Sequence, residues 1–300
     1  MSDAYAHGTS SDTRRLPPWL RRPIARSGEF LATEELVSEL ELNTVCRSAK
    51  CPNRGECYAS GTATFLVLGS ACTRGCRFCA VETRAPSAPD PEEPIRVAEA
   101  ARRMGLRHVV VTMVTRDDLP DGGAAHVVAA IEAVREAVPS VAVEVLVGDF
   151  AGDEAAIDAV AAARPDVFNH NLETVPRLYT SVRPGADYRR SLGVLARARK
   201  TIPEMPTKSG LMLGLGETAD EVRAVMDDLL DHGVEMLTLG QYLRPSPAHL
   251  PVAEFVAPEV FAELARDAYR RGFTAVASAP FVRSSYHAGE LESSRHAEER

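Results

Sequence analysis

Short runs rich in Val, Leu and Ile alternate with longer amphipathic stretches along the chain from Ala63 onward. This alternation predicts parallel β-strands that are each followed by a helix covering the sheet. Pro94 precedes a helix expected over residues 95–104, which Gly105 stops, and Gly233 follows a helix expected over residues 217–231. The expected strands are residues 64–68, 108–114, 141–147, 166–169, 209–213, 235–239 and 274–277.

Repeated strand–helix units fit two architectures, a barrel and a doubly wound sheet, and the periodicity does not separate them. In both architectures ligands bind at the C-terminal ends of the strands. A chain of 300 residues has room for one large core, so one catalytic domain with terminal extensions is the simplest organisation. We expect an N-terminal extension over residues 1–62, a catalytic domain over 63–277 and a C-terminal extension over 278–300.

Composition and charge narrow the class of protein. Hydrophobic residues make up 45% of the chain and charged residues 25%, as in an ordinary globular enzyme. The formal net charge of −8 disfavours nucleic acid as a partner. No apolar run approaches the roughly 18 residues that span a bilayer, and the start of the chain lacks the apolar core of a secretory signal. We therefore expect a cytoplasmic protein with no nucleic-acid or membrane partner.

All six cysteines lie between Cys46 and Cys79, a distribution that does not suit a disulfide framework for a large domain. In a reducing cytosol, closely spaced thiolates suit zinc or iron–sulfur binding. The downstream cysteines, Cys72, Cys76 and Cys79, form a C-x3-C-x2-C motif just after the first expected strand. Three thiolates leave one iron of a 4Fe-4S cluster open to a small molecule. Zinc is the less favoured alternative, because structural zinc motifs usually pair two ligands with two more across a gap.

The upstream cysteines, Cys46, Cys51 and Cys57, have the spacing C-x4-C-x5-C. Two cubane clusters need eight ligands; the cysteines supply six and a small molecule can take one, so one further protein ligand is missing. The Arg-Ser-Ser-Tyr segment at residues 283–286 is the leading candidate, because it follows the last expected strand and should emerge on the same face as the downstream motif. A serine oxygen is a hard donor beside thiolates, which would make this corner weakly held. An ordinary polar loop is the alternative interpretation.

The downstream motif, with Phe78 beside its last cysteine, resembles the radical S-adenosylmethionine superfamily. More specifically, the two cysteine motifs followed by Arg-Ser-Ser-Tyr resemble the lipoyl synthase family, from about residue 15 to residue 290. For the fold, this resemblance implies a partial (β/α)6-type barrel of parallel strands. Ala279 departs from a glycine expected before Pro280, which concerns loop geometry rather than a ligand. Further segments similar to the family are residues 51–53, 56–57, 116–123, 170–175 and 241–246.

The resemblance also implies a reaction, the radical insertion of two sulfur atoms at C6 and C8 of an octanoyl-lysine on a lipoyl carrier domain. The downstream cysteines would hold the cluster that cleaves S-adenosylmethionine to a 5′-deoxyadenosyl radical. The upstream cysteines, with Ser285 or alternatively Ser284, would hold an auxiliary 4Fe-4S cluster that donates sulfur. Implied partners are an electron donor such as flavodoxin or ferredoxin and an iron–sulfur carrier. The alternatives are another radical sulfur-inserting or methylthiolating enzyme, and a non-catalytic zinc or iron–sulfur protein.

Polar residues and glycines after other expected strands are candidates for binding S-adenosylmethionine. Those after the second strand could instead form a solvated ion pair, those after the fourth could cap a helix, and the glycines after the fifth could serve ordinary turns. Those after the sixth lie in a segment similar to the family. The candidates are Arg116, Asp117, Asn169, Asn171, Glu173, Gly214, Gly216, Gln241 and Tyr242.

The upstream cysteines raise a geometric difficulty. A strand of about six residues is roughly 20 Å long, and these cysteines precede the first expected strand, so they start at the wrong end of the barrel. The N-terminal extension must therefore fold back across the barrel for Cys57 to approach Ser285.

Overall fold

The computed structural model describes residues 16–21, 28–49, 51–286, 288–289 and 291. Its centre is an eight-stranded sheet in the order β1-β2-β5-β6-β7-β8-β9-β10, with β1 antiparallel to β2 and every other neighbouring pair parallel. In the described residues this ladder runs from β1 to β10 without closing. The strands are β1 Asn43–Thr44, β2 Thr62–Val67, β5 His108–Met113, β6 Ala142–Leu146, β7 Val167–Asn169, β8 Thr207–Leu213, β9 Met236–Gln241 and β10 Ala275–Ser278.

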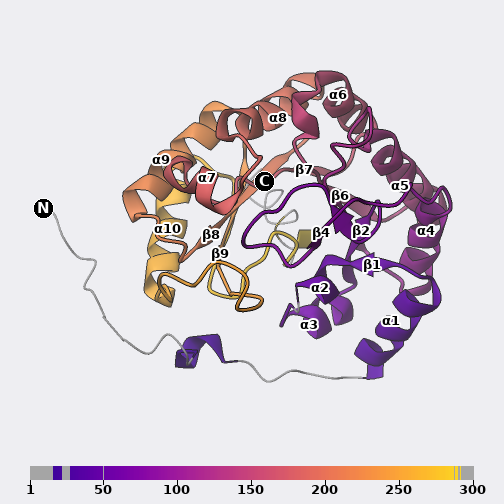
Figure 1. Ribbon diagram of the computed structural model, residues 1–300, viewed down its shortest axis with the longest axis horizontal. Helices are drawn as coiled ribbons and strands as arrows, with labels where there is room; N and C mark the ends of the chain where they lie inside the picture. The colour runs from indigo at the N-terminus through magenta and orange to yellow at the C-terminus, as the bar shows by residue number, and fades with distance from the viewer. Residues whose placement is uncertain (1–15, 22–27, 50, 287, 290, 292–300) are drawn as a thin grey trace, which may run out of the picture.

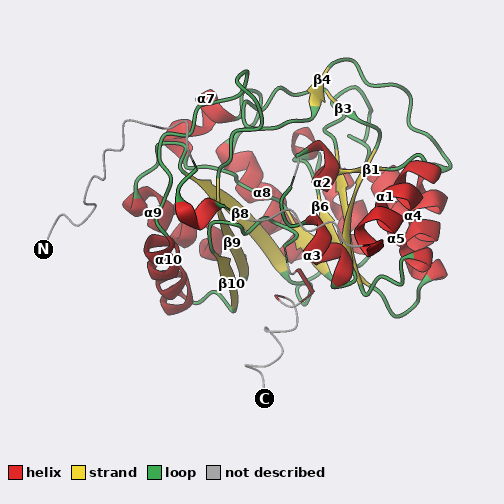
Figure 2. Ribbon diagram, turned by 90° about the horizontal axis from the view of Figure 1, so that it is seen from below, coloured by secondary structure: helices red, strands yellow, loops and turns green. Residues whose placement is uncertain are grey.

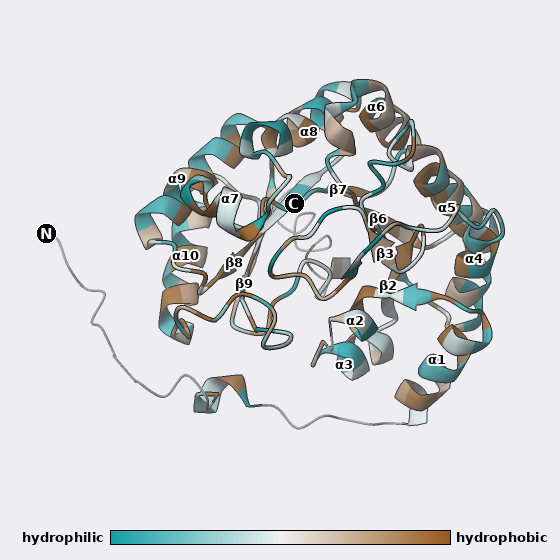
Figure 3. Ribbon diagram, in the orientation of Figure 1, coloured by the Kyte–Doolittle hydropathy of each residue, from teal (hydrophilic) through white to brown (hydrophobic). Residues whose placement is uncertain are grey.

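One long helix follows each of β2, β5, β6, β7, β8 and β9 and packs on the outside of the curved sheet (Figures 1 and 2). These helices carry hydrophilic and hydrophobic positions side by side, as expected for elements with one face on the sheet and one in solvent (Figure 3). The predicted α/β class and partial (β/α)6-type barrel are confirmed. The covering helices are α4 Glu93–Arg103, α5 Ala124–Ala137, α6 Glu154–Ala162, α8 Tyr188–Thr201, α9 Ala219–Asp231 and α10 Pro258–Arg271.

Shorter elements fill the N-terminal region and the loops. Helices α1, α2 and α3 precede β2, and the two-stranded sheet β3-β4 lies in the loop that follows β2. None of the helices in the described ranges is long and apolar enough to cross a membrane. The short elements are η1 Pro18–Leu20, α1 Gly28–Glu39, α2 Val45–Ser48, α3 Arg54–Ala59, β3 Ala71–Cys72, β4 Glu82–Thr83, η2 Phe150–Gly152, η3 Pro176–Leu178 and α7 Tyr179–Val182.

The expected strands agree with the observed ones to within a few residues at each end, and their limits have local causes. In β5, Val109, Val110 and Val111 are fully buried, as in a parallel sheet covered on both faces. Strand β2 ends before the expected Leu68, which has a left-handed φ of 68° and whose N–H donates to the Glu93 carboxylate (2.7 Å) instead of the ladder.

The helix expected from residue 217 begins two residues later. Thr218 caps α9, accepting from the Glu221 N–H (3.3 Å) while the Glu221 carboxylate accepts from the Thr218 N–H (2.8 Å). Glu217 lies outside the helix, and its carboxylate accepts from the N–H groups of Gly214 (2.5 Å) and Leu215 (2.9 Å).

The expected extensions are continuous with the barrel. Thr62, the last residue of the expected N-terminal extension, is the first residue of β2, and β1 from the same extension pairs with that strand. The division into three regions stays a prediction, and its residues 1–15, 22–27 and 292–300 lie outside the described residues.

A buried ion pair crosses the interior of the barrel between β6 and β8. Lys208 Nζ lies 3.0 Å from both carboxylate oxygens of Glu144, and both side chains are fully buried. Asn169 Nδ2 donates to Glu144 Oε1 (2.9 Å), and His108 Nε2 lies 3.5 Å from Glu144 Oε2. Burial raises the pKa of Glu144, but the opposing effects of Lys208, His108 and Asn169 are larger and lower it to about 2.

Replacing Lys208 by Met should lower the free energy of unfolding by about 3–5 kcal/mol, because the Glu144 charge is then buried without its partner. Urea unfolding at neutral pH measures the loss, and the double variant with Glu144→Gln should recover most of it. Arg164→Gln is the matched control: it breaks an ion pair with Glu204 whose side chains are both 65% exposed, so it should cost less than about 1 kcal/mol. Equal losses in Lys208→Met and Arg164→Gln would contradict this account.

The same ion pair should make the free energy of unfolding depend on pH in the acidic range. The pKa of Glu144 is lower in the folded chain, so its contribution is fully present above the ordinary value of 4.5 and is lost as the pH falls towards about 2. The stability difference between the wild type and the Glu144→Gln, Lys208→Met double variant should shift in favour of the double variant over this range. Urea unfolding at a series of acidic pH values measures the shift, and a constant difference would refute the assignment.

Candidate active site

The downstream cysteines lie in the loop that leaves β2, which the parallel pair β3-β4 closes at its base. Two backbone N–H groups of this loop donate to cysteine sulfurs, Arg74 N to Cys72 Sγ (3.4 Å) and Val81 N to Cys79 Sγ (3.5 Å). Thr73 N and Thr73 Oγ1 both donate to the Thr115 carbonyl after β5, at 3.1 and 3.0 Å. The loop is thus attached to the neighbouring strand end.

Burial dominates the acidity of these thiols. It raises the pKa of Cys79 to about 12, and it raises the pKa of Cys76 against the opposing effect of the nearby Arg183 guanidinium. A thiol must lose its proton to ligate iron, so cluster binding and proton release are coupled here. Three free thiols with N–H donors on two of the sulfurs fit a 4Fe-4S cluster with one open iron.

Buried polar atoms without a partner lie beside this loop, on the segment after β7. They are His170 Nε2, Asn171 Oδ1 and Arg183 Nε, for which the described chain offers no hydrogen bond. Buried polar atoms are nearly always paired in folded proteins, so these atoms suit a polar ligand that supplies both donors and acceptors. Glu173 is also here; burial raises its pKa, and Arg183 and Asn171 oppose that effect.

Arg183 is a residue that sequence reasoning missed. Its Nη1 donates to the carbonyls of Asn171 and Leu172 (both 3.0 Å) and to Tyr179 Oη (2.9 Å), and its charge acts on Cys76. Arg183 follows a short helix, where an arginine ordinarily lies in solvent, so no local pattern distinguishes it. Only the folded arrangement places it beside the downstream cysteines.

The candidates after β5 are engaged within the protein. Arg116 is 1% exposed, and its Nε and Nη2 donate to the two carboxylate oxygens of Asp118 (both 2.8 Å). Asp117 accepts from Thr73 Oγ1 (2.9 Å) and receives a bidentate pair from Arg74. Their assignment to S-adenosylmethionine stays a prediction, while their observed task is to hold loops together.

The candidates after β8 and β9 support a loop. Gln241 Nε2 donates to the carbonyls of Leu213 (3.0 Å) and Glu254 (3.0 Å), and its Oε1 accepts from Val256 N (2.8 Å). Gly214 has a φ of 97°, and a Cβ there would lie 2.3 Å from Gln241 Nε2 and from the Glu254 carbonyl. This glycine is needed for packing.

The remaining candidates differ in whether their polar atoms are already bonded within the protein. Gly216 has a φ of 109°, and a Cβ there would make ordinary contact with Ala253 Cβ (3.9 Å). Tyr242 Oη donates to the Leu250 carbonyl (2.8 Å), and Asn169 keeps a buried Oδ1 without a partner in the described chain. Their contact with a cofactor also stays a prediction.

The N-terminal extension does fold back to the C-terminal segment. Asn53 Nδ2 donates to the Phe281 carbonyl (2.7 Å), and Tyr286 Oη donates to Glu56 Oε1 (3.0 Å). Cys51 lies close enough to Arg283 to oppose the lowering of the arginine pKa by burial. The residues on both sides of the two serines therefore contact the segment that carries the upstream cysteines.

The upstream cysteines form a second group, in which Cys46 is buried and Cys51 and Cys57 are half-buried. Burial raises the pKa of Cys46 to about 12, with Cys51 and Cys57 near enough to add to the shift. The two serines have different surroundings: Ser284 Oγ accepts from Asn171 Nδ2 (2.5 Å), whereas in the described part of the chain Ser285 Oγ has no hydrogen bond. Asn171 also donates to Glu173 (3.1 Å), so it connects the two regions.

No group of three or more His, Cys, Asp or Glu side chains among the described residues is arranged around a single metal ion. A cubane cluster is a different kind of ligand, because its thiolates bind separate irons at separate corners.

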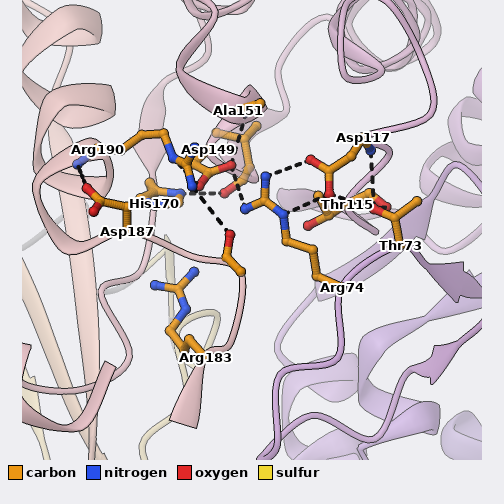
Figure 4. Close-up of polar contacts among 12 residues, drawn as sticks. Thr73, Arg74, Thr115, Asp117, Asp149, Ala151, His170, Arg183, Asp187 and Arg190 are labelled. Atoms are coloured by element: carbon orange, nitrogen blue, oxygen red, sulfur yellow. Dashed lines mark hydrogen bonds and ion pairs between the residues drawn. The ribbon is translucent and has the colours of Figure 1, made fainter. Parts of the chain in front are cut away.

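Charged side chains around Arg74 connect the downstream loop to the ends of β5 and β6 and to α8 (Figure 4). Arg74 binds Asp117 and Asp149, and Asp149 also pairs with Arg190 of α8 (2.9 Å). His170 lies in the same group, and burial together with the nearby Arg183 lowers its pKa to about 4, so it is neutral near pH 7.

Comparison with known proteins agrees with this geometry. Residues 66–229 match the model of the radical SAM superfamily. The chain is 57% identical to the lipoyl synthase of Caldanaerobacter subterraneus subsp. tengcongensis, over 92% of this chain and 96% of that protein, and 56% identical to that of Methylococcus capsulatus, over 92% of this chain and 86% of that protein.

Solved structures with a similar fold include methylornithine synthase, with a TM-score of 0.56 and 14% identity over 81% of this chain and 74% of that one. Another is SuiB of Streptococcus suis bound to S-adenosylmethionine, with a TM-score of 0.54 and 10% identity over 73% of this chain and 49% of that one. The chain belongs to the lipoyl synthase family, within the radical SAM superfamily.

Proposed function

We propose that this chain performs the sulfur insertion of its family with two groups of cysteines that have different tasks. As a lipoyl synthase it is a sulfurtransferase that uses a 4Fe-4S cluster and S-adenosylmethionine and acts on octanoylated lipoyl carrier domains. The single observation that carries the division of tasks is that the cysteines form two groups and that the Arg-Ser-Ser-Tyr segment lies against the segment of the upstream one, through Tyr286 with Glu56 and Arg283 near Cys51.

The substrate explains why radical chemistry is needed. The methylene groups at C6 and C8 of an octanoyl chain have no acidic proton and no leaving group, so acid–base and nucleophilic catalysis have no point of attack. When bound, the first cluster and S-adenosylmethionine supply a carbon radical, and the auxiliary cluster supplies the sulfur.

The downstream cysteines would hold the first cluster, and the segment after β7 would bind S-adenosylmethionine. Asn171 Oδ1 is a buried acceptor and Arg183 Nε a buried donor, so together they suit a ligand with both hydroxyl or amine groups and a carboxylate. The neutral His170 adds a polar group without adding charge. Burial of these groups keeps water from the reacting atoms, which prevents side reactions of a radical.

The upstream cysteines would hold the auxiliary cluster together with Ser285. Ser284 already accepts from Asn171, which leaves the Ser285 hydroxyl as the available oxygen of this pair. An oxygen ligand matches iron–sulfur chemistry poorly, which suits a cluster that is taken apart in each turnover.

Turnover then requires two proteins from outside the chain, an electron donor such as flavodoxin or ferredoxin and an iron–sulfur carrier that rebuilds the auxiliary cluster. Six free thiols and two labile clusters favour a reducing compartment, so we place the protein in the cytoplasm.

Incubation with an octanoyl-lysine peptide, excess reductant and S-adenosylmethionine should add two sulfur atoms to the peptide. Mass spectrometry of the peptide measures this gain, and Cys76→Ser should abolish it because the first cluster loses a ligand. Iron and sulfide analysis of the reconstituted chain is the companion measurement, with about eight irons expected for two cubes. An unchanged peptide, or zinc without acid-labile sulfide, refutes the proposal.

The two serines provide a matched pair of variants. Ser285→Ala should weaken the auxiliary cluster, so that iron falls from about eight towards about four per chain after brief exposure to a chelator. Ser284→Ala removes a hydroxyl of the same size from the neighbouring position and should retain about eight irons under the same treatment. If Ser285→Ala keeps its iron and Ser284→Ala loses it, the assignment is reversed and Ser284 is the ligand.

A further inference from the structure

Arg74 occupies a central position in the downstream loop, between Cys72 and Cys76. Its side chain is 11% exposed and binds two carboxylates at once. Nε and Nη2 donate to the two oxygens of Asp117 (2.8 and 2.6 Å), and Nη1 lies 2.7 Å from Asp149 Oδ1 (Figure 4). Such multidentate charged contacts fix both the position and the plane of a guanidinium group.

Asp149 is itself held rigidly at the end of β6. Its side chain is 1% exposed, accepts from Ala151 N (3.1 Å) and pairs with Arg190 Nε (2.9 Å). The contact with Ala151 depends on left-handed backbone at Phe150 (φ 46°) and Ala151 (φ 52°), which costs non-glycine residues energy and persists only where surrounding contacts impose it. The carboxylate that receives Arg74 is therefore positioned in advance.

The main chain of Arg74 contacts one of the candidate cluster ligands, Cys72. Its N–H donates to Cys72 Sγ (3.4 Å), and its carbonyl accepts from Thr83 Oγ1 (3.4 Å). The preceding Thr73 is fixed to the end of β5 through the Thr115 carbonyl. Hydrogen bonds to the sulfurs help set the reduction potential of an iron–sulfur cluster, and contacts that orient ligands help set its affinity.

We propose that Arg74 is a positioning residue for the first cluster. Clamped between Asp117 and Asp149, it keeps its own N–H on Cys72 Sγ, which arranges the loop to receive iron and makes the bound cluster easier to reduce. The proposal rests on the proposed function only in that the downstream cysteines hold a 4Fe-4S cluster. It assigns Asp117 and Asp149 to the clamp, so Asp117 acts through Arg74.

The electrostatics of the clamp favour this task over direct catalysis. Two arginines, Arg74 and Arg190, face two carboxylates, so the group is neutral as a whole. His170, the nearest titratable ring, is uncharged near pH 7, as its pKa of about 4 requires. A neutral clamp fixes geometry without adding net charge beside the thiolates.

The test uses the full chain with the upstream cysteines replaced by serine, so that only the downstream loop can take up a cluster. In this background we compare Arg74→Gln and Asp149→Asn with the control Arg77→Gln. Arg77 lies in the same loop, but among the residues that the structure describes its side chain makes a single hydrogen bond, to the Ser181 carbonyl (3.3 Å). Three properties are measured after anaerobic reconstitution: the rate of iron loss to a chelator, the midpoint potential of the cluster and the melting temperature.

The control should load about four irons and keep the potential of the parent. Arg74→Gln and Asp149→Asn should lose iron about tenfold faster, and their potentials should become more negative because the N–H donor leaves Cys72 Sγ. Arg74→Lys keeps the charge without the double contact, so it should fall between Arg74→Gln and the parent.

The outcomes distinguish a failure of the Arg74 clamp from a failure of cluster binding by the downstream cysteines. If Arg74→Gln and Asp149→Asn have the same potential and the same rate of iron loss as Arg77→Gln, the clamp is overturned. A lower melting temperature with an unchanged potential also overturns it, because the contacts would then be merely structural. If the parent background and Arg77→Gln take up no cluster at all, the proposed function fails at the downstream cysteines instead.

Discussion

The parallel pairing of β2 to β9 determines where the polar chemistry of this protein can lie. Parallel strands end at a common edge, so the segments after β2, β5, β6 and β7 meet there although they are far apart in the sequence. The downstream cysteines arrive from the first of these segments, Asp117 from the second, Asp149 from the third and Asn171 from the fourth. The buried pair of Glu144 and Lys208 ties β6 to β8 below this edge.

Charge compensation is the second constraint, because cluster ligation converts buried neutral thiols into thiolates. Each cysteine group has a half-buried arginine near it, Arg183 by Cys76 and Arg283 by Cys51. A guanidinium stays protonated even where burial lowers its pKa, so it supplies a fixed positive charge in a place where water does not screen the thiolates. Arg183 comes from the segment after β7 and Arg283 from the segment after β10, so the two charges reach the cysteines from strands that come later in the chain than the cysteines themselves.

Much of the fold and of the candidate ligands could be predicted from the sequence, because those signals are local. Buried runs such as residues 109–111 mark strands, and the spacing of the cysteines limits what they can bind. What the sequence did not reveal depends on partners far away in the chain. Asp149 is an ordinary loop aspartate until Arg74 meets it, and nothing local in the sequence shows that the amide of Gln241, whose contact with a cofactor stays a prediction, bonds to the loop around Glu254. Pairings of this kind leave no periodic pattern, and the resemblance to a family gave positions without their contacts.

The two cysteine groups are closed by different parts of the fold. The downstream loop is fixed by contacts to the ends of β5 and β6 and by the buried Asp149. The upstream group is closed by contacts between the two extensions, such as Asn53 with the Phe281 carbonyl and Tyr286 with Glu56, and the last of these is exposed. In the proposed function the first group holds a reusable cofactor and the second a cluster that is consumed and rebuilt, so the two groups make different demands on their surroundings.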